Sequence, residues 1–526
     1  MRLSNIKKLC FGILLIAGIC GLGFSLHAAM RDTFEFDPDE GTNLIKARLV
    51  NEGFDLYKQI WSDQPPLFTA LLASWFRIFG SGVYSGRILV LLFSILLLWG
   101  FYQNIKIRTD ILTARIACIF LILSAQFLIL SISVMIGLPS LALAMLSLYC
   151  ATAYSYSGRK TELFLSAILM AFSLLTKFFT VFMLPLILLE IILRKDRDKK
   201  ASARVLLPGI FWLSDVTLAY SLIIIAYFYP ELCLFTGQLF KPHIAKINIP
   251  QADFSVILRL LIQDFDLAIL AIFGLIMNMR AKKTRHILLP VLWLGMTLLF
   301  LTLHRPVWDH YYLLISLPLC WLAAIFFTGS LRKAKKDKKF FYYAALPLII
   351  LAAIMLPFKL FDTCFLLSLA GKREENKALE LIARSKTNDR WIFTDLPIYA
   401  FNNGILVPPE TAVLTVKRMP TAELATQVLQ KYKPGLILLG RFQSYSPELT
   451  SVILADYRKA AAISIQRALI NPPLLRQPIT SFLPQNKKWP CYYTQDLILY
   501  MKKTGRLKNI KIKKEQLLSI PDVGRV

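Results

Sequence analysis

The feature that most constrains this chain is a succession of long apolar segments that fills much of its first 360 residues. A helix needs about 20 apolar residues to cross roughly 30 Å of hydrocarbon. Candidate spans occur at 9–29, 83–103, 111–130, 134–154, 162–176, 178–193, 205–229, 262–279, 287–303, 311–329 and 340–360. The pair at 162–193 is short and is broken at Lys177, so it forms either two spans or one re-entrant element. Only 18% of the residues are charged, against about a quarter in soluble domains. The pattern therefore predicts a polytopic α-helical membrane protein with about eleven transmembrane helices.

The basic residues of the connecting segments predict the orientation. Lys and Arg accumulate on the cytoplasmic side of short loops, and here they are concentrated at 106–108, 159–160, 194–204, 280–285 and 332–339. These are alternate connections, whereas the long connection 30–82 is acidic or mixed. We therefore expect a cytoplasmic N-terminus, a retained first span rather than a cleaved signal peptide, and an extracytoplasmic C-terminal region. A bacterial inner membrane is the expected location.

The net charge of +28 has the same origin. Basic loops that face anionic lipid need no nucleic-acid partner, so we expect membrane lipids, and no nucleic acid, as the partners of this charge. The eight cysteines are scattered, without C-x-x-C spacing, and are expected to be packing residues. A disulfide among Cys233, Cys364 and Cys491 is conceivable on the outer side.

Three regions are expected. Residues 1–360 form the transmembrane domain, whose long first outer loop contains helices over 42–52 and from Pro65-Pro66 to Phe79. Residues 361–500 form a small extracytoplasmic α/β domain, with helices at 377–385 and 421–432 and strands at 391–394, 435–439 and 496–500. Residues 501–526 form a basic tail. The C-terminal region contains no glycine-rich phosphate loop, so no nucleotide is assigned to it.

The most informative polar motif is Asp37-Pro38-Asp39-Glu40-Gly41, which directly follows the first apolar segment. Asp37 as N-cap, Pro38 as first helical residue and Glu40 three residues after the cap form a capping-box-like helix start. Capping therefore accounts for Asp37 and Glu40 but leaves Asp39 less well explained. A general base needs a carboxylate close to a substrate hydroxyl at a partly desolvated site, and Asp39 meets that requirement.

The segments FDPDEG and ARLVNEGFDLYKQIWSDQPPLFTALLASWFRIFG resemble the first outer loop of glycosyltransferase-C membrane enzymes. The match is to the branch of the protein O-mannosyltransferases and the lipid A aminoarabinose transferase. The resemblance continues in LLTKFFTVFMLPLILL, in HRPVWDHYYLLISLPL and in TDLPIYAFNNGILVPPE. It thus touches most of the chain.

The resemblance implies an inverting glycosyltransferase that moves a sugar from a polyprenyl-phosphate-linked donor to an acceptor hydroxyl on the outer face. The acceptor can be a glycan, a lipid or a protein. Asp39 would take the acceptor proton, and Glu40 would position it or help to bind the acceptor. Cations near the outer interface should stabilise the lipid phosphate that leaves, and Lys177, Arg305 and His310 fit that role. Their ordinary interpretations are interfacial snorkelling for Lys177 and Arg305, and a structural hydrogen bond for His310.

Two departures from the family pattern are visible. Gln64 stands where many relatives have a basic residue before the Pro-Pro pair, which reduces that phosphate contact to a neutral hydrogen bond or moves it elsewhere. Relatives also often place an acid near the outer start of the fourth span, where this chain has Gly137 and Ser140. No second catalytic carboxylate can be carried over, although Asp63 remains available beside Gln64. We expect no obligatory cofactor or metal.

Two alternatives belong to other classes. In a transporter or flippase of lipid-linked sugars, the acids and Lys177 would line a path, and Asp215, Asp264 and Asp266 lie near span ends. However, no strong internal repeat of the transporter kind is present, and such a protein would not need a large outer α/β domain. A catalytically silent assembly subunit of the same fold is the second alternative.

Overall fold

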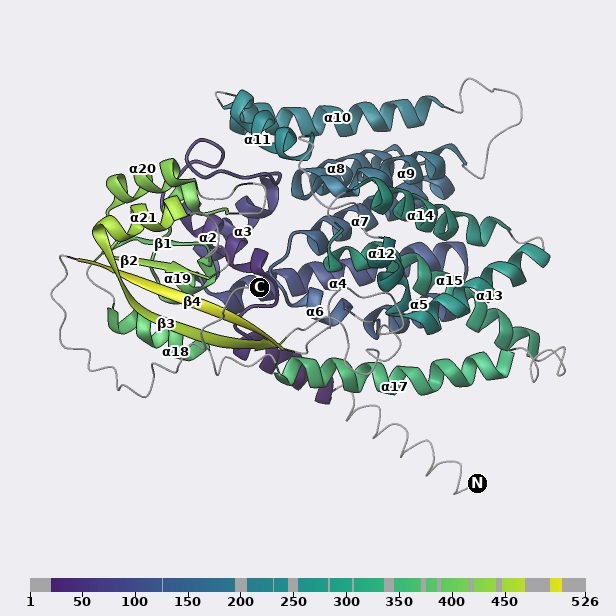
Figure 1. Ribbon diagram of the computed structural model, residues 1–526. Helices are drawn as coiled ribbons and strands as arrows, with labels where there is room; N and C mark the ends of the chain where they lie inside the picture. The colour runs from purple at the N-terminus through teal and green to yellow at the C-terminus, as the bar shows by residue number, and fades with distance from the viewer. Residues whose placement is uncertain are drawn as a thin grey trace.

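The computed structural model describes residues 20–503, apart from gaps at 125, 194–205, 230, 245–253, 282–283, 305–306, 335–344, 370–374, 386–388, 415–417, 419–420, 441–446 and 469–491. The described chain forms a helical bundle and a smaller domain built on a sheet, with two short helices between them (Figure 1). Most of the predicted span 9–29, the basic tail beyond Lys503, and Cys491 lie outside the described residues.

Five helices of the bundle are long and apolar enough to cross a membrane. They are α4 (Val83–Arg108), α7 (Gly137–Ser157), α10 (Leu207–Phe228), α14 (Thr284–Leu303) and α15 (Tyr312–Ala334). Shorter or less apolar bundle elements are α5 (Ile111–Ile122), α6 (Phe127–Ser131), α8 (Lys160–Thr176), η1 (Phe178–Phe182), α9 (Met183–Ile192), α11 (Leu232–Ile244), α12 (Phe254–Ile262), α13 (Phe265–Arg280) and α17 (Leu346–Leu369). The prediction of a helical membrane protein is confirmed with at least five candidate spans. The predicted span 111–130 is divided between α5 and α6.

The bundle is held together by close contact between its central helices, α4, α7, α8, α13 and α15. Trp212, Trp293 and Trp321 are completely buried in it. At Gly274 an added Cβ would lie 2.6 Å from the carbonyl oxygen of Leu322, so only glycine lets α13 and α15 approach this closely. The helix α10 lies at the edge of the bundle (Figure 1). Many of its large apolar side chains are exposed.

The long first loop contains the two expected helices, α2 (Pro38–Asn51) and α3 (Leu67–Phe79). Gly53 follows the first with φ +90° and Gly80 ends the second with φ +86°, a backbone conformation that side-chain-bearing residues rarely adopt. Residues 42–52 and 65–79 therefore fold as predicted. Both helices lie between the bundle and the C-terminal domain (Figure 1).

The C-terminal domain has a four-stranded mixed sheet in the order β1-β2-β4-β3. Its elements are α18 (Glu375–Ser385), β1 (Ile392–Thr394), α19 (Pro397–Asn402), η5 (Pro409–Thr411), α20 (Ala422–Tyr432), β2 (Leu436–Leu439), α21 (Pro447–Asp456), β3 (Tyr457–Ala468) and β4 (Tyr492–Lys502). β1 pairs with β2 in parallel, with Ile392 opposite Leu436, and β4 pairs antiparallel with both β2 and β3. The predicted helices and strands are present, whereas α19, α21 and the long strand β3 were not predicted.

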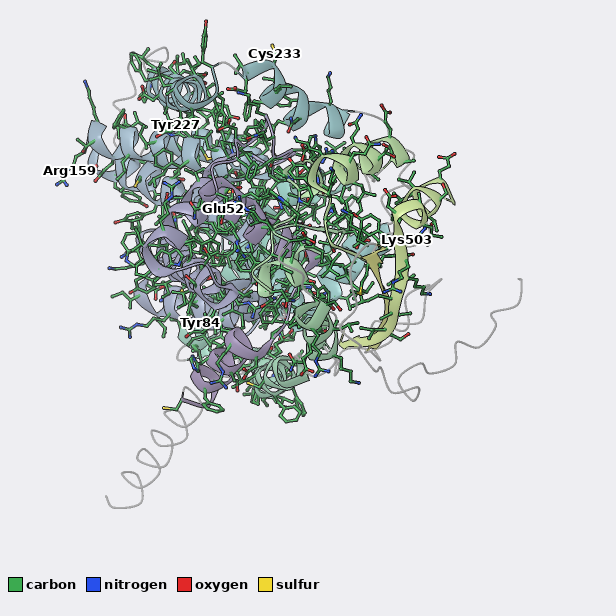
Figure 2. The ribbon with its side chains drawn as sticks, turned by 90° about the vertical axis from the view of Figure 1, so that its left-hand side faces the viewer. Glu52, Tyr84, Arg159, Tyr227, Cys233 and Lys503 are labelled. Carbon is green, nitrogen blue, oxygen red and sulfur yellow. The ribbon has the colours of Figure 1, made fainter. Side chains whose placement is uncertain are left out.

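The helix α19 joins this domain to the long first loop by packing directly on α2. An added Cβ at Gly41 would lie 2.7 Å from the backbone nitrogen of Ile398, so the two helices touch through their backbones. The rings of Phe34 and Tyr399 lie 4.6 Å apart between centroids, and Arg48 donates to the carbonyl of Gly404 at 3.1 Å. In the view onto this domain, Glu52 at the end of α2 lies near the centre and Lys503 at the end of β4 lies to the right (Figure 2). The C-terminal domain therefore contacts both α2 and the segment just before it.

Candidate active site

The candidate site begins at the first turn of α2. Asp37 is the N-cap and its side chain accepts a hydrogen bond from the Asp39 amide at 2.9 Å, with Pro38 as the first helical residue. Asp37 and Pro38 therefore begin the helix as predicted, whereas the Glu40 carboxylate accepts from the Phe36 amide rather than from the Asp37 amide that a capping box uses. The three acids of the motif differ in solvent exposure: Asp37 is half-buried, Asp39 is exposed and Glu40 is completely buried.

Glu40 is the anchor of this turn. Its carboxylate accepts two hydrogen bonds from Arg87 at 2.9 and 2.8 Å, one from the Phe36 amide at 3.0 Å and one from the Val134 amide at 3.1 Å. Arg87 is also completely buried and donates to the carbonyls of Met30 and Thr33, each at 2.8 Å. A bidentate, charge-assisted pair of this kind is both strong and geometrically specific. Glu40 therefore fixes the turn that carries Asp39.

Arg87 is a residue that the sequence analysis missed. It lies in the first turns of α4, inside the predicted span 83–103. A charged residue at the beginning of an apolar segment is the signal that could have drawn attention to it, because buried ionisable groups in such segments are rare unless they are paired.

Lys177 lies at a break between helices, as the sequence suggested. α8 ends at Thr176, Lys177 is extended (φ −155°, ψ 128°), and the 3-10 helix η1 follows. Its ammonium lies 5.1 Å from the ring centroids of both Phe179 and Tyr311, and only 8% of the residue is exposed. An ideal Cβ on Gly137 would be 4.0 Å from the Lys177 Nζ. The start of α7, where relatives often carry an acid, is thus next to this ammonium but supplies no carboxylate.

Asp63 and Gln64 precede α3 and are both half-buried. The carbonyl of Gln64 accepts hydrogen bonds from the Tyr57 hydroxyl at 2.8 Å and from the Ser62 hydroxyl at 3.1 Å, which fixes the backbone just before Pro65. Tyr57 has the positive φ of 71° and is packed against the rings of Phe228 and Phe235 at 5.1 and 5.0 Å. The loop that carries Asp63 is therefore rigid.

The connection between α14 and α15 supplies the opposite side of the site. It contains the 3-10 turn η3 (Asp309–Tyr311). The Nδ1 of His310 lies 3.7 Å from the Asp37 carboxylate, and the Nε2 of His304 lies 3.1 Å from the Tyr311 hydroxyl oxygen. Arg305, which was predicted to help with the phosphate, lies outside the described residues.

Charged groups from these elements interact electrostatically with one another. Burial lowers the pKa of Lys177, whereas Asp39, Asp37 and Asp63 raise it. Burial likewise lowers the pKa of Lys46 on α2, against Asp63 and Asp39. Burial also raises the pKa of Tyr311, with contributions from Asp39 and Asp63. The same two carboxylates thus act on three buried groups that come from α2, the α8–η1 joint and η3.

This arrangement puts an exposed carboxylate near buried ammonium groups, which suits proton abstraction beside a bound anion. Asp37, Asp39, Asp63, Lys177 and His310 are brought to one end of the bundle, with Gln64 next to them in sequence. Within the described ranges, no three histidine, cysteine, aspartate or glutamate side chains lie close enough to hold a metal ion. Independence from metal remains a prediction.

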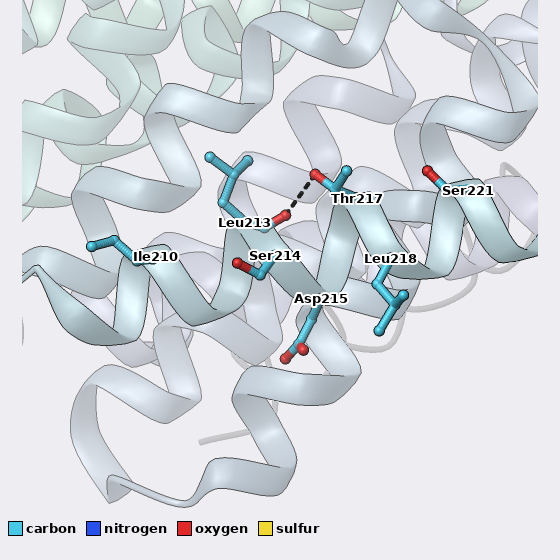
Figure 3. A pocket seen from close by; sticks show the side chains of 7 residues that line it. All are labelled: Ile210, Leu213, Ser214, Asp215, Thr217, Leu218 and Ser221. Carbon is cyan, nitrogen blue, oxygen red and sulfur yellow. Dashed lines mark hydrogen bonds between the residues drawn. The ribbon is translucent and has the colours of Figure 1, made fainter.

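Other ionisable residues of the bundle lie apart from this set. Lys359 of α17 pairs with Asp264 at 2.8 Å and with Asp266 at 2.6 Å, and all three are buried. Asp215 lies on α10 in a pocket formed by that helix, where Thr217 donates to the Leu213 carbonyl at 2.9 Å (Figure 3). The pocket is lined by Ile210, Leu213, Ser214, Asp215, Thr217, Leu218 and Ser221. None of the predicted site residues lines it.

Residues 63–226 match the family model described as dolichyl-phosphate-mannose-protein mannosyltransferase. The structure resembles ArnT from Cupriavidus metallidurans in the apo state, with a TM-score of 0.60 and 14% identity over 86% of this chain and 96% of that one. It also resembles the same protein bound to undecaprenyl phosphate, with a TM-score of 0.59 and 13% identity over 92% and 98% of the two chains.

A more distant likeness is to the archaeal oligosaccharyltransferase AglB from Archaeoglobus fulgidus, in complex with an inhibitory peptide and a dolichol-phosphate. Its TM-score is 0.50 at 10% identity, over 84% of this chain and 73% of that one. Among curated proteins, no sequence matches this chain significantly. The family match includes Asp63, Gln64 and Lys177 but begins after α2, so Asp39 and Glu40 lie outside it. The predicted resemblance to this group of proteins is confirmed.

Proposed function

From the premise that the chain has the glycosyltransferase-C fold and a segment of the protein mannosyltransferase family, we propose that it is an inverting glycosyltransferase. Its donor is a sugar linked to a polyprenyl phosphate, and its acceptor is a hydroxyl group on the extracytoplasmic side of the membrane. The proposal is supported chiefly by the exposed Asp39 carboxylate, which acts electrostatically on the buried Lys177 ammonium.

Asp39 is the general base of the proposed reaction. The acceptor oxygen attacks the anomeric carbon as Asp39 takes its proton, the bond from that carbon to the phosphate oxygen breaks, and the polyprenyl phosphate leaves with the electron pair. A single displacement of this kind inverts the anomeric centre. Two features support the assignment. The Asp39 carboxylate is accessible, and its amide is held by Asp37.

Glu40 acts as a positioning residue in this scheme. All of its described hydrogen bonds are to Arg87 or to backbone amides, and its side chain is completely inaccessible to solvent. A carboxylate in that state has no oxygen surface left for a substrate. Of the two roles expected from the sequence, these contacts favour orientation of the helix start over direct binding of the acceptor.

Lys177 stabilises the charge that develops on the leaving phosphate. Its ammonium makes no ion pair with described residues, and its contacts to the rings of Phe179 and Tyr311 fix its position without neutralising it. A positioned cation in a site from which water is excluded favours such a transition state. His310, beside Asp37, and Gln64 contribute polar contacts. Arg305 stays a prediction from the sequence.

The relatives in the comparisons support the class of donor. One structural neighbour is bound to undecaprenyl phosphate and another to a dolichol-phosphate. The acceptor can be a glycan, a lipid or a protein, and side chains of the first outer loop, the bundle and the C-terminal domain would set that preference. The proposed location is the bacterial inner membrane, with the C-terminal domain outside the cytoplasm.

The experiment that tests the function starts from the lipids of a deletion strain. The accumulated polyprenyl-phospho-sugar in its extract is identified by mass spectrometry and supplied to purified protein in lipid nanodiscs. We expect release of polyprenyl phosphate that depends on the acceptor. If the protein releases none from any donor pool yet moves labelled lipid across vesicles, a transporter is the correct class. If it does neither, a silent assembly subunit is favoured.

A further inference from the structure

Lys46 is a second buried cation of the site that the sequence analysis did not single out. Only 2% of the residue is exposed. In the described part of the chain it makes no hydrogen bond or ion pair. A buried charge without a partner is costly, since neither water nor a counter-ion compensates for it.

Two other buried cations outside the candidate site, Arg87 and Lys359, show what a structural role looks like in this protein. Arg87 pairs with Glu40 and donates to two backbone carbonyls. Lys359 lies between two carboxylates at 2.8 and 2.6 Å. Each is compensated by direct contacts, whereas Lys46 is not. An internal structural partner therefore does not explain why this position carries an ammonium group.

The position of Lys46 on α2 places it in the candidate site. It follows Asp39 by seven residues, which is two helical turns on the same face, or about 10 Å along the axis. Asn43, between them, donates to the Val134 carbonyl at 2.9 Å and fixes that face against the loop before α7. Asp63, directly before Gln64, is the acid that acts most strongly on Lys46. Lys46 thus interacts electrostatically with the residue next to Gln64, the position at which many relatives have a basic residue.

We propose that Lys46 binds the phosphate group of the polyprenyl-linked donor and of the released product, and that it supplies from α2 the cation that Gln64 does not. The inference rests on the proposed function, which it extends by a binding residue. The lipid phosphate is the missing counter-ion, and Lys46 and Lys177 hold it from two directions. In this arrangement Asp39 faces the acceptor.

The test is equilibrium binding of undecaprenyl phosphate to the full-length protein in nanodiscs, measured for four proteins. They are the wild type, Lys46→Met, the charge-relocated double variant Lys46→Met with Gln64→Lys, and the control Lys58→Met. Lys58 belongs to the same outer loop but is exposed and lies 3.5 Å from Glu231. Inorganic phosphate is titrated in parallel to separate recognition of a lipid from that of a free anion.

We expect Lys46→Met to raise the Kd for undecaprenyl phosphate about ten- to a hundredfold, the effect of one lost charge-assisted hydrogen bond. The double variant should recover at least tenfold of that loss, and Lys58→Met should bind as the wild type does. The ligand-free thermal midpoint of Lys46→Met should be equal to or higher than that of the wild type, because an uncompensated buried charge has been removed.

Three results would overturn the inference. Unchanged binding by Lys46→Met shows that the ammonium does not contact the phosphate. A lowered ligand-free midpoint for this variant assigns Lys46 a structural role. Tighter binding of inorganic phosphate than of the lipid shows a free-anion site instead. If the wild type binds no polyprenyl phosphate at all, the proposed function itself fails. If the wild type binds the lipid and Lys46→Met binds it with the same Kd, only the inference about Lys46 fails.

Discussion

The Arg87–Glu40 pair offers the sharpest test of how the site is supported. In Arg87→Met, the Glu40 carboxylate loses its two bonds at 2.9 and 2.8 Å. The carbonyls of Met30 and Thr33 also lose their donor. Both side chains are completely buried, so no water replaces these contacts. Breaking a buried pair from one side costs about 3–5 kcal/mol, against a typical total stability of about 5–15 kcal/mol.

The assay is the thermal midpoint of monodisperse protein in detergent, followed by fluorescence-detected size exclusion. We expect a large drop for Arg87→Met and a smaller one for the double variant Arg87→Met with Glu40→Leu, which removes the stranded carboxylate. Arg77→Met is the matched control, since its bond to Asn51 is on the exposed surface of the loop. A midpoint for Arg87→Met equal to that of the control would refute the reasoning, as would a double variant less stable than the single one.

Three further predictions concern the same region. Lys177→Met should lower the rate of sugar transfer at least tenfold while the protein stays folded, as judged by an unchanged thermal midpoint; a wild-type rate would remove Lys177 from the site. Gly41→Ala should lower the thermal midpoint by an amount that corresponds to about 1–3 kcal/mol of overpacking, because the new Cβ would lie 2.7 Å from the Ile398 backbone nitrogen of α19. An unchanged midpoint would show that α19 can shift to accommodate the methyl group without loss of stability. Because burial lowers the pKa of the Lys46 and Lys177 ammonium groups below the usual 10.5, their charge is lost earlier as the pH rises. The affinity for undecaprenyl phosphate should therefore fall in the alkaline range before an ordinary lysine would titrate, and a flat profile up to pH 10.5 would contradict this.

Elements with strong local signals could be predicted from the sequence. Asp37 and Pro38 begin α2, Gly80 ends α3, and Lys177 interrupts an apolar run where α8 ends. The division of 111–130 into α5 and α6 was not predicted, although the polar residues Ser124 and Gln126 interrupt the apolar run between the two helices. Here Gln126 bonds to Gln263 of a distant segment at 2.8 Å. The strand β3 was missed because its alanine-rich sequence favours a helix, and pairing with β4 along its length overrides that preference.

The site residues divide in the same way. Asp39 and Lys177 could be selected from their neighbours in the sequence. The Glu40–Arg87 pair joins residues 47 positions apart, and nothing local specifies that contact. Lys46 resembles an ordinary polar residue of a short helix. It becomes buried only because α2 is enclosed between the bundle and α19. Long-range packing, which no single segment encodes, therefore decides which charges are buried.

The role of Asp39 as general base is tested by the transfer rate of Asp39→Asn under single-turnover conditions, with a polyprenyl-phospho-sugar donor and saturating acceptor. We expect a loss of about a hundredfold or more, the usual contribution of a general base. Binding of undecaprenyl phosphate and the thermal midpoint should match the wild type. A variant that is folded, binds the lipid and transfers sugar as fast as the wild type would contradict that role.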